Sequence, residues 1–286
     1  MKGIILAGGF GTRLYPMTTN ISKQLLPIYD KPMIYYSLST LMRLKIRDIL
    51  IISSKEFINI YKNIFKYSYK LGIKISYLSQ NYPNGIAESF IIGKDFIGKD
   101  NVTLILGDNF FYGLNSGILK FEEFKKNFGA KIFAYKVNEP QNYGVINIYK
   151  NNKIKNIIEK PKKPNSNYVA TGLYVYDNNV IKKVTKLKPS KRGELEITDL
   201  NNLYIKEKKL EAIFLQSGSV WLDAGTSQDL LKASQFVQTV QDRQKILIGS
   251  PEETAYFNNW VSKNKLKGII SHMPENEYSK HLINLL

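Results

Sequence analysis

The 286-residue sequence contains no cysteine and only two histidines, and each scarcity excludes a class of chemistry. Without cysteine the chain forms no disulfide and holds no metal through thiolates. His272 and His281 are too few for a zinc site. No run of about 18 apolar residues occurs, as a membrane-spanning helix needs, and the apolar run after Lys2 is too short for a signal peptide. We therefore expect a cytoplasmic protein without a membrane partner.

Arginine is also scarce, which bears on the formal net charge of +17. A charge of this size is typical of nucleic-acid-binding proteins. Those proteins favour arginine, because its planar guanidinium binds phosphates and base edges through paired hydrogen bonds. Only five of the 41 basic residues here are arginines, and the lysines form no basic stripe. We therefore expect no nucleic-acid partner.

The first half of the sequence alternates between two patterns. Short apolar runs bounded by turn residues, typical of strands buried on both faces, occur at 3–7, 48–53, 73–78, 102–107 and 131–137. Stretches with helical spacing lie between them, at 32–45, 55–69, 86–97 and 116–128. This alternation predicts an α/β fold with a doubly wound, mostly parallel sheet.

After Val137 the pattern changes. Residues 143–161 alternate apolar and polar around "KNNK", which predicts a hairpin, and 168–177 read as a further strand. Helical periodicity returns at 194–208 and 226–247. No linker, repeat or low-complexity tract separates these parts. We expect one compact domain with an inserted antiparallel lobe and a helical C-terminus.

The first predicted strand leads directly into a glycine-rich loop with two cations. Gly8, Gly9 and Gly11 can place successive N–H groups around an anion, and Arg13 and Lys23 follow. The loop is not a P-loop, because Thr12-Arg13 stands where Lys-Ser/Thr is required. It is not a dinucleotide fingerprint either, because its third glycine is replaced by Leu14. The loop is predicted to hold a polyphosphate; the alternative is a surface turn with two solvated cations.

The stretch "GGFGTRLYPMTTNISKQLLPIYDKPMI" (8–34) resembles the signature of sugar-1-phosphate nucleotidyltransferases. The resemblance implies a Rossmann-like nucleotidyltransferase fold over residues 1–240, with a nucleotide-binding half at about 1–137 and a sugar-binding half at about 138–240. Residues 241–286 would form a helical segment for oligomerisation and regulation.

Further stretches at 106–113, 137–148, 157–177, 188–201 and 220–226 resemble the glucose-1-phosphate thymidylyltransferase branch of that family, so that the resemblance covers nearly the whole chain. It implies the transfer of a thymidylyl group from dTTP to glucose 1-phosphate, giving dTDP-glucose and pyrophosphate. It further implies a Mg²⁺ cofactor, a homotetramer, and feedback inhibition by dTDP-rhamnose, the end product of the pathway that begins with this step.

The same resemblance implies the roles of individual residues. The catalytic residues would be Arg13, Lys23 and Asp108, with Arg13 and Lys23 on the departing pyrophosphate. Mg²⁺, which prefers oxygen ligands, would be held by Asp108 and Asp223. The nucleotide would be bound by Gly8, Gly9, Gly11, Thr12, Arg13, Lys23, Gln24, Gln80 and Gly85. The sugar phosphate would be bound by Asn109, Gly144, Glu159, Lys160, Val169, Gly172 and Tyr174.

The sequence departs from the family pattern at three informative positions. Glu88 replaces a glutamine and Asn84 an aspartate in the base-binding stretch, and Phe257 stands where an arginine of the regulatory segment is usual. Two alternatives stay open: the same chemistry with UTP, CTP or ATP, or a non-catalytic nucleotide-sugar-binding subunit. Such a subunit would be expected to lose a cation or a metal-binding carboxylate. This chain keeps both cations, Arg13 and Lys23, and both carboxylates, Asp108 and Asp223.

Overall fold

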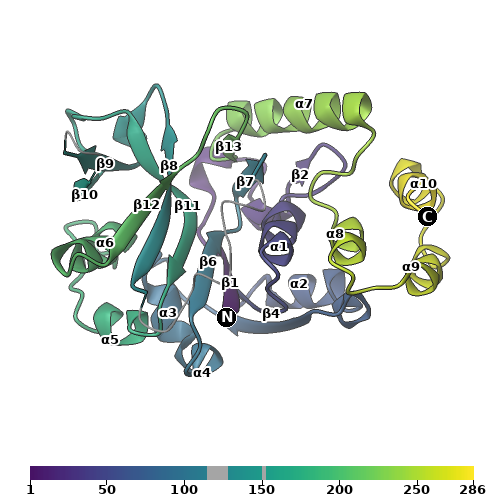
Figure 1. The fold of residues 1–286 in the computed structure, drawn as a ribbon, viewed down its shortest axis with the longest axis horizontal. Coiled ribbons are helices and arrows are strands. Elements are labelled where there is room, and N and C mark those ends of the chain that lie inside the picture. Colours follow the sequence, from purple (N-terminus) through teal and green to yellow (C-terminus); the bar gives the residue numbers. More distant parts are fainter. Residues whose placement is uncertain (115–127, 150–152) are drawn as a thin grey trace.

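The computed structural model describes residues 1–114, 128–149 and 153–286, and within them nine strands form one mixed sheet (Figure 1). The main strand order is β10-β9-β11-β6-β1-β4-β5, while β8 pairs with β11 and β12 pairs with β8. The strands are β1 (Lys2–Ala7), β4 (Asp48–Ser53), β5 (Lys74–Ser79), β6 (Val102–Leu106), β8 (Ala130–Lys136), β9 (Gly144–Ile148), β10 (Ile154–Glu159), β11 (Tyr168–Tyr176) and β12 (Leu210–Phe214).

The centre of the sheet is parallel, as the apolar runs predict. β1 pairs with β4 and β6, and β4 pairs with β5, all in parallel register. Successive residues of β1, β4 and β6 face opposite sides and are nearly all buried, which explains why their sequences are almost continuously apolar. β5, at the edge of the sheet, is partly exposed.

Helices cover both faces of the sheet. Ile5 and Ile51 belong to a core shared with α1 (Ile34–Arg43), α2 (Ile58–Ile64) and the C-terminal helices. Ile4 and Leu50 belong to a second core, shared with α3 (Glu88–Ile92), α4 (Lys94–Ile97), α5 (Val180–Val184) and α6 (Ile197–Lys206). This three-layer arrangement is the doubly wound architecture expected from the sequence.

The antiparallel lobe also agrees with prediction. β9 and β10 form the hairpin expected around "KNNK", and β11 runs antiparallel to β6, β8 and β9. Figure 1 shows the β9–β10 hairpin at one end of the molecule and the last two helices of the chain at the other. Two small antiparallel pairs, β2 (Pro27–Ile28) with β3 (Lys31–Pro32) and β7 (Asn109–Tyr112) with β13 (Val220–Asp223), lie outside the main sheet.

The C-terminal region is helical, with α7 (Ser227–Gln244), α8 (Pro251–Phe257), α9 (Lys263–Ile270) and α10 (Glu277–Asn284). Thr226, Ser250, Ser262 and Asn276 cap their N-termini by accepting backbone N–H groups. Trp260, between α8 and α9, stacks on Arg47 of the same chain, with the guanidinium carbon 4.5 Å from the ring centre.

Two predicted helices are shorter than their periodicity suggests. The stretch 55–69 contains α2 followed by a 3₁₀ turn, η3 (Ser68–Leu71), and 86–97 is divided into α3 and α4 at Gly93. The helix predicted over 116–128 lies, except for residue 128, outside the described residues. In the described part of the chain no helix is both long and apolar enough to cross a membrane.

Candidate active site

The strand order places the glycine loop beside Asp108. β4 and β6 flank β1 on opposite sides, so the connections leaving β1 and β6 diverge and open a crevice at the carboxyl ends of these strands. Gly8 directly follows β1, Asp108 lies two residues beyond β6, and the Gly107 N–H donates to the Leu6 carbonyl at 2.9 Å. Residues 100 apart in sequence thus meet at one edge of the sheet.

The glycine loop adopts a backbone that requires glycine. Gly9 and Gly11 have φ values of 96° and 60°, in the left-handed region. A Cβ at Gly11 would lie 2.8 Å from the Thr18 side chain and 3.3 Å from Cβ of Lys23. Thr12 and Arg13 continue into a 3₁₀ turn, η1 (Thr12–Leu14). The loop therefore brings backbone N–H groups, Arg13 and the Cβ of Lys23 close together.

Two carboxylates approach each other at this edge. In the β7–β13 pair Asp223 is the register partner of Asn109, and the Ala224 N–H donates to the Asp108 carbonyl at 3.1 Å. Burial, and then the charge of Asp108, raise the pKa of Asp223 to about 6. Burial also opposes ionisation of Asp108, but the charge and hydrogen bond of Lys23 and a hydrogen bond from Asn109 hold its pKa below the ordinary value.

This donor set fits a magnesium ion that shares its coordination with substrate phosphates. In residues 1–114, 128–149 and 153–286, no group of three or more His, Cys, Asp or Glu side chains is arranged to hold a metal by itself. Mg²⁺ typically takes one or two carboxylates and completes its shell with water and phosphate oxygens. Asp108 and Asp223 supply two carboxylates whose mutual repulsion a cation would relieve.

The two cations of the loop differ in their surroundings. Lys23 is buried, and its Nζ lies 2.5 Å from Oδ2 of Asp108. Arg13 is exposed and makes no hydrogen bond or ion pair with any described residue. Its Nη2 lies 3.2 Å from the position that a Cβ of Gly225 would take. Arg13 is thus available to an anionic ligand, whereas Lys23 is paired with Asp108.

A second group of charged side chains surrounds Glu159. Glu159 accepts a hydrogen bond from the Thr198 hydroxyl at 2.6 Å, and Arg192 Nη2 lies 3.6 Å from its other oxygen. Lys160, with a positive φ of 42°, extends its half-exposed side chain from the same turn. A Cβ at Gly144 would lie 3.1 Å from the Thr198 hydroxyl, so glycine leaves room there. A carboxylate and two cations together suit a sugar that carries a phosphate.

Asn109 links Asp108 to β11 and β13. Its Nδ2 donates to Asp108 at 2.9 Å, while its Oδ1 accepts from Trp221 Nε1 at 2.6 Å and from the Gly172 N–H at 3.0 Å. A Cβ at Gly172 would lie 2.4 Å from that oxygen, which explains glycine at this position. Asn109 is therefore a fixed support for the acidic pair.

One cavity of about 210 Å³ is lined by many of the residues expected from the sequence: Arg13, Asp108, Asn109, Gly144, Glu159, Lys160, Gly172, Tyr174 and Asp223. The side chain of Val169, expected on the sugar side, is instead completely buried in the core. Gln24 is buried beneath the loop, where its Nε2 donates to the Gly8 carbonyl at 3.3 Å. Gln80 lies beside Gly8, and Gly85 lies beside Gln80 and against Leu195, outside the set of residues that line the cavity.

Sequence reasoning missed several lining residues. Tyr143 donates to Asp223 at 3.0 Å, and Trp221, Arg192 and Thr198 line the same cavity. Tyr143 is one of 19 tyrosines, and nothing in its local sequence distinguishes it. Arg192 could have been found, because arginine is rare in this lysine-rich chain.

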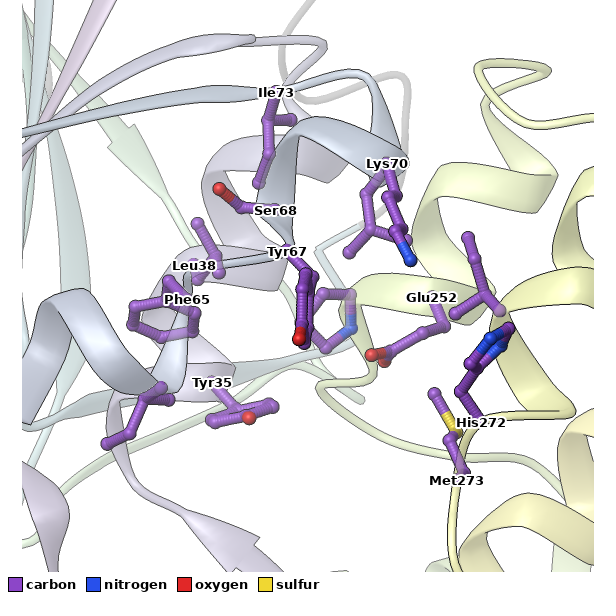
Figure 2. A pocket seen from close by; sticks show the side chains of 14 residues that line it. Tyr35, Leu38, Phe65, Tyr67, Ser68, Lys70, Ile73, Glu252, His272 and Met273 are labelled. Atoms are coloured by element: carbon purple, nitrogen blue, oxygen red, sulfur yellow. The ribbon is translucent and has the colours of Figure 1, made fainter.

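A larger cavity, of about 370 Å³, lies between the core and the C-terminal helices. Figure 2 shows Tyr35, Phe65 and Tyr67 facing Glu252, His272 and Met273 across it. Glu252 accepts a hydrogen bond from Tyr278 at 2.5 Å. The lining of this cavity is mainly aromatic and aliphatic and includes none of Arg13, Asp108 and Asp223. The smaller cavity, which all three of these residues line, is therefore the candidate active site.

Comparison with known proteins agrees with this geometry. Residues 2–240 match the family model described as nucleotidyl transferase. Over its whole length the chain is 48% identical to a glucose-1-phosphate thymidylyltransferase of Neisseria meningitidis, of which it covers 99%. It is 44% identical over 288 aligned residues to one of Mycolicibacterium smegmatis, again with 99% of that protein covered. The chain belongs to the nucleotidyl transferase family.

Solved structures show the same fold. A crystal structure of a Bacillus anthracis protein described as a glucose-1-phosphate thymidylyltransferase, in complex with sucrose, superimposes with a TM-score of 0.76. It is 41% identical, and the match covers 82% of this chain and 94% of that one. A UDP-glucose pyrophosphorylase with bound UDP-glucose gives a TM-score of 0.72 at 24% identity, covering 83% of this chain and 98% of that one, a likeness of fold alone.

Proposed function

We propose that this protein is an enzyme that transfers a thymidylyl group from dTTP to glucose 1-phosphate, releasing pyrophosphate. The observation that carries the proposal is the single cavity lined by Arg13, by the carboxylates Asp108 and Asp223, and by the neighbouring Glu159 and Arg192. Relatives that are 44 to 48% identical over their whole length support the choice of dTTP and glucose 1-phosphate.

The reaction is an in-line displacement. An oxygen of the sugar phosphate forms a bond to the α-phosphorus of dTTP, and the bond from that phosphorus to the bridging oxygen breaks as pyrophosphate leaves. Because two polyanions must meet, the protein contributes positioning and charge neutralisation rather than a covalent nucleophile. Mg²⁺ held by Asp108 and Asp223 would neutralise charge on the phosphate oxygens.

The residues of this chain divide the work between the two substrates. The N–H groups of the glycine loop and the unpaired Arg13 bind the triphosphate, and Lys23 holds Asp108 while its charge faces the same phosphates. Lys160 and Arg192 neutralise the sugar phosphate, and Glu159 accepts hydrogen bonds from sugar hydroxyls. On this reading residues 1–137 form the nucleotide-binding half and 138–240 the sugar-binding half. We further propose a cytoplasmic homotetramer, in which residues 241–286 contribute to assembly.

A substrate panel tests the proposal. Purified protein is incubated with Mg²⁺, glucose 1-phosphate and radiolabelled dTTP, UTP, CTP or ATP, and pyrophosphate release is followed. We expect release that requires the sugar phosphate, is abolished by EDTA, and has its highest kcat/KM with dTTP. A higher kcat/KM with another triphosphate would correct the nucleobase. No sugar-phosphate-dependent release from any of them would indicate a non-catalytic subunit.

A further inference from the structure

Gln80 lies between the glycine loop and α3 with a side chain that is only 6% exposed. Its Nε2 donates to Oε2 of Glu88 at 2.7 Å and lies 3.4 Å from the Gly85 carbonyl oxygen. Its Oε1 accepts no hydrogen bond from the residues that the structure describes, and it lies 2.8 Å from the position that a Cβ of Gly8 would take. The amide oxygen is therefore directed at the glycine loop, where a nucleotide would lie.

The chemistry of its neighbours dictates this orientation. A carboxylate and a backbone carbonyl only accept hydrogen bonds, so the amide NH₂ of Gln80 has to face Glu88 and Gly85. With glutamine at position 88, as in the family pattern, a pair of amides could bond in either direction. The glutamate at this position removes that freedom.

The surrounding loop holds Glu88 in place. Its other oxygen, Oε1, accepts a hydrogen bond from the Asn84 side chain at 2.9 Å. The backbone of the loop is tied to Leu195, which donates to the Asn84 carbonyl at 2.7 Å and accepts from the Ala87 N–H at 3.2 Å. The position of Glu88 is thus set by groups independent of Gln80.

We propose that Glu88 is a positioning residue that fixes the Gln80 amide with its oxygen toward the nucleobase, and so selects pyrimidines that carry an N–H at ring position 3. Thymine and uracil donate from N3 and match the Gln80 oxygen. Cytosine presents an acceptor there and would face a second acceptor. The inference rests on the proposed function, and it adds the residue that determines this part of the selectivity.

Calorimetric titration of dTTP, dUTP and dCTP in the presence of Mg²⁺ tests it, on the parent and on Glu88→Gln. We expect the ratio of dTTP to dCTP affinity to fall on the order of tenfold in the variant. The charge-assisted hydrogen bond from Gln80 is then replaced by a neutral bond between two amides, which can form with either amide as the donor. The ratio of dTTP to dUTP affinity should not change, since both bases present the same N–H. Glu88→Ala should act in the same direction.

Asn84→Ala is the matched control: it removes one side-chain hydrogen bond of Glu88 but keeps both the hydrogen bond from Gln80 and the backbone hydrogen bonds to Leu195 that hold the loop. It should keep the parent ratios. A general loosening of the loop would weaken all three nucleotides equally and would overturn the proposal, as would a dTTP to dCTP ratio unchanged in both Glu88 variants. Binding needs no turnover, so a parent that prefers dTTP to dCTP but releases no pyrophosphate would contradict the proposed function alone.

Discussion

Asp108→Asn separates the stabilising role of Asp108 from its proposed role as a metal ligand. The substitution keeps the shape of the side chain but removes the partner of Lys23, whose side chain is only 8% exposed. Asp108 now accepts from both Lys23 and Asn109. An asparagine has one oxygen for these two donors, so one of the two hydrogen bonds is lost and two N–H groups face each other.

The expected loss of unfolding free energy is about 2 to 4 kcal/mol. Breaking a fully buried ion pair costs about 3 to 5 kcal/mol, and a lost hydrogen bond to a charged group about 1.5 to 3 kcal/mol. The expected loss lies below that of a fully buried ion pair because the Asp108 side chain is 23% exposed and Asp223 remains as a partial counter-charge for Lys23. A protein of ordinary stability, about 5 to 15 kcal/mol, stays folded after this loss.

Turnover should fall by at least about a hundredfold at the same Mg²⁺ concentration, the usual effect of removing one preorganised charge from a reacting phosphate. Urea unfolding and pyrophosphate release measure the two effects. Asp108→Asn combined with Lys23→Met removes the unpaired cation and should recover stability without recovering turnover. Near-parent turnover in Asp108→Asn would remove Asp108 from the metal site, and a destabilisation below about 0.5 kcal/mol would refute the ion-pair argument.

Three further predictions concern other parts of the molecule. Arg13→Lys keeps the positive charge but loses the paired N–H donors of the planar guanidinium, so kcat should fall roughly 10- to 100-fold. A kcat equal to that of the parent would show that Arg13 does not contribute to the reaction. Burial raises the pKa of Glu253 to about 7 from 4.5, so its contribution to stability is complete below pH 4.5 and is lost as the pH rises through about 7. Glu253→Gln should therefore raise the unfolding free energy by about 1 to 3 kcal/mol at pH 8 but not at pH 4.5, and an equal gain at both would contradict this. Phe257, which is 62% exposed, stands where the resemblance in sequence implies an arginine, so dTDP-rhamnose should inhibit weakly and compete with dTTP; tight noncompetitive inhibition would contradict this.

The sequence predicts the central strands of the sheet well, because a strand that is buried on both faces has a continuous run of apolar residues. Ile4 and Ile5 face different cores, so both must be apolar, and the run that they belong to is easily recognised. The division of residues 86–97 at Gly93 was not predicted, because a single glycine inside a helical pattern is usually tolerated. The periodicity around it remains helical on both sides.

The candidate site was predicted unevenly, for a physical reason. Asp108 and Asp223 could be named from motifs, but their approach depends on the pairing of β7 with β13, two short strands about 110 residues apart. Trp221 reaches the site through that same pairing, and Tyr143 reaches it by packing against Trp221, at 5.3 Å between ring centres. Such contacts leave no local pattern, so they become visible only in the folded chain.

Arginine is the one composition signal that points to specific contacts. Arg192 donates from Nε to one oxygen of Glu196 and from Nη2 to the other, a pairing that needs the planar guanidinium, and Arg47 stacks on Trp260. Arg13 lies against Gly225 with its donors free for a ligand. A lysine could supply the charge at each position but neither the fork nor the flat face. At these three positions the shape of the cation therefore matters as well as its charge, and two of the three, Arg13 and Arg192, line the candidate site.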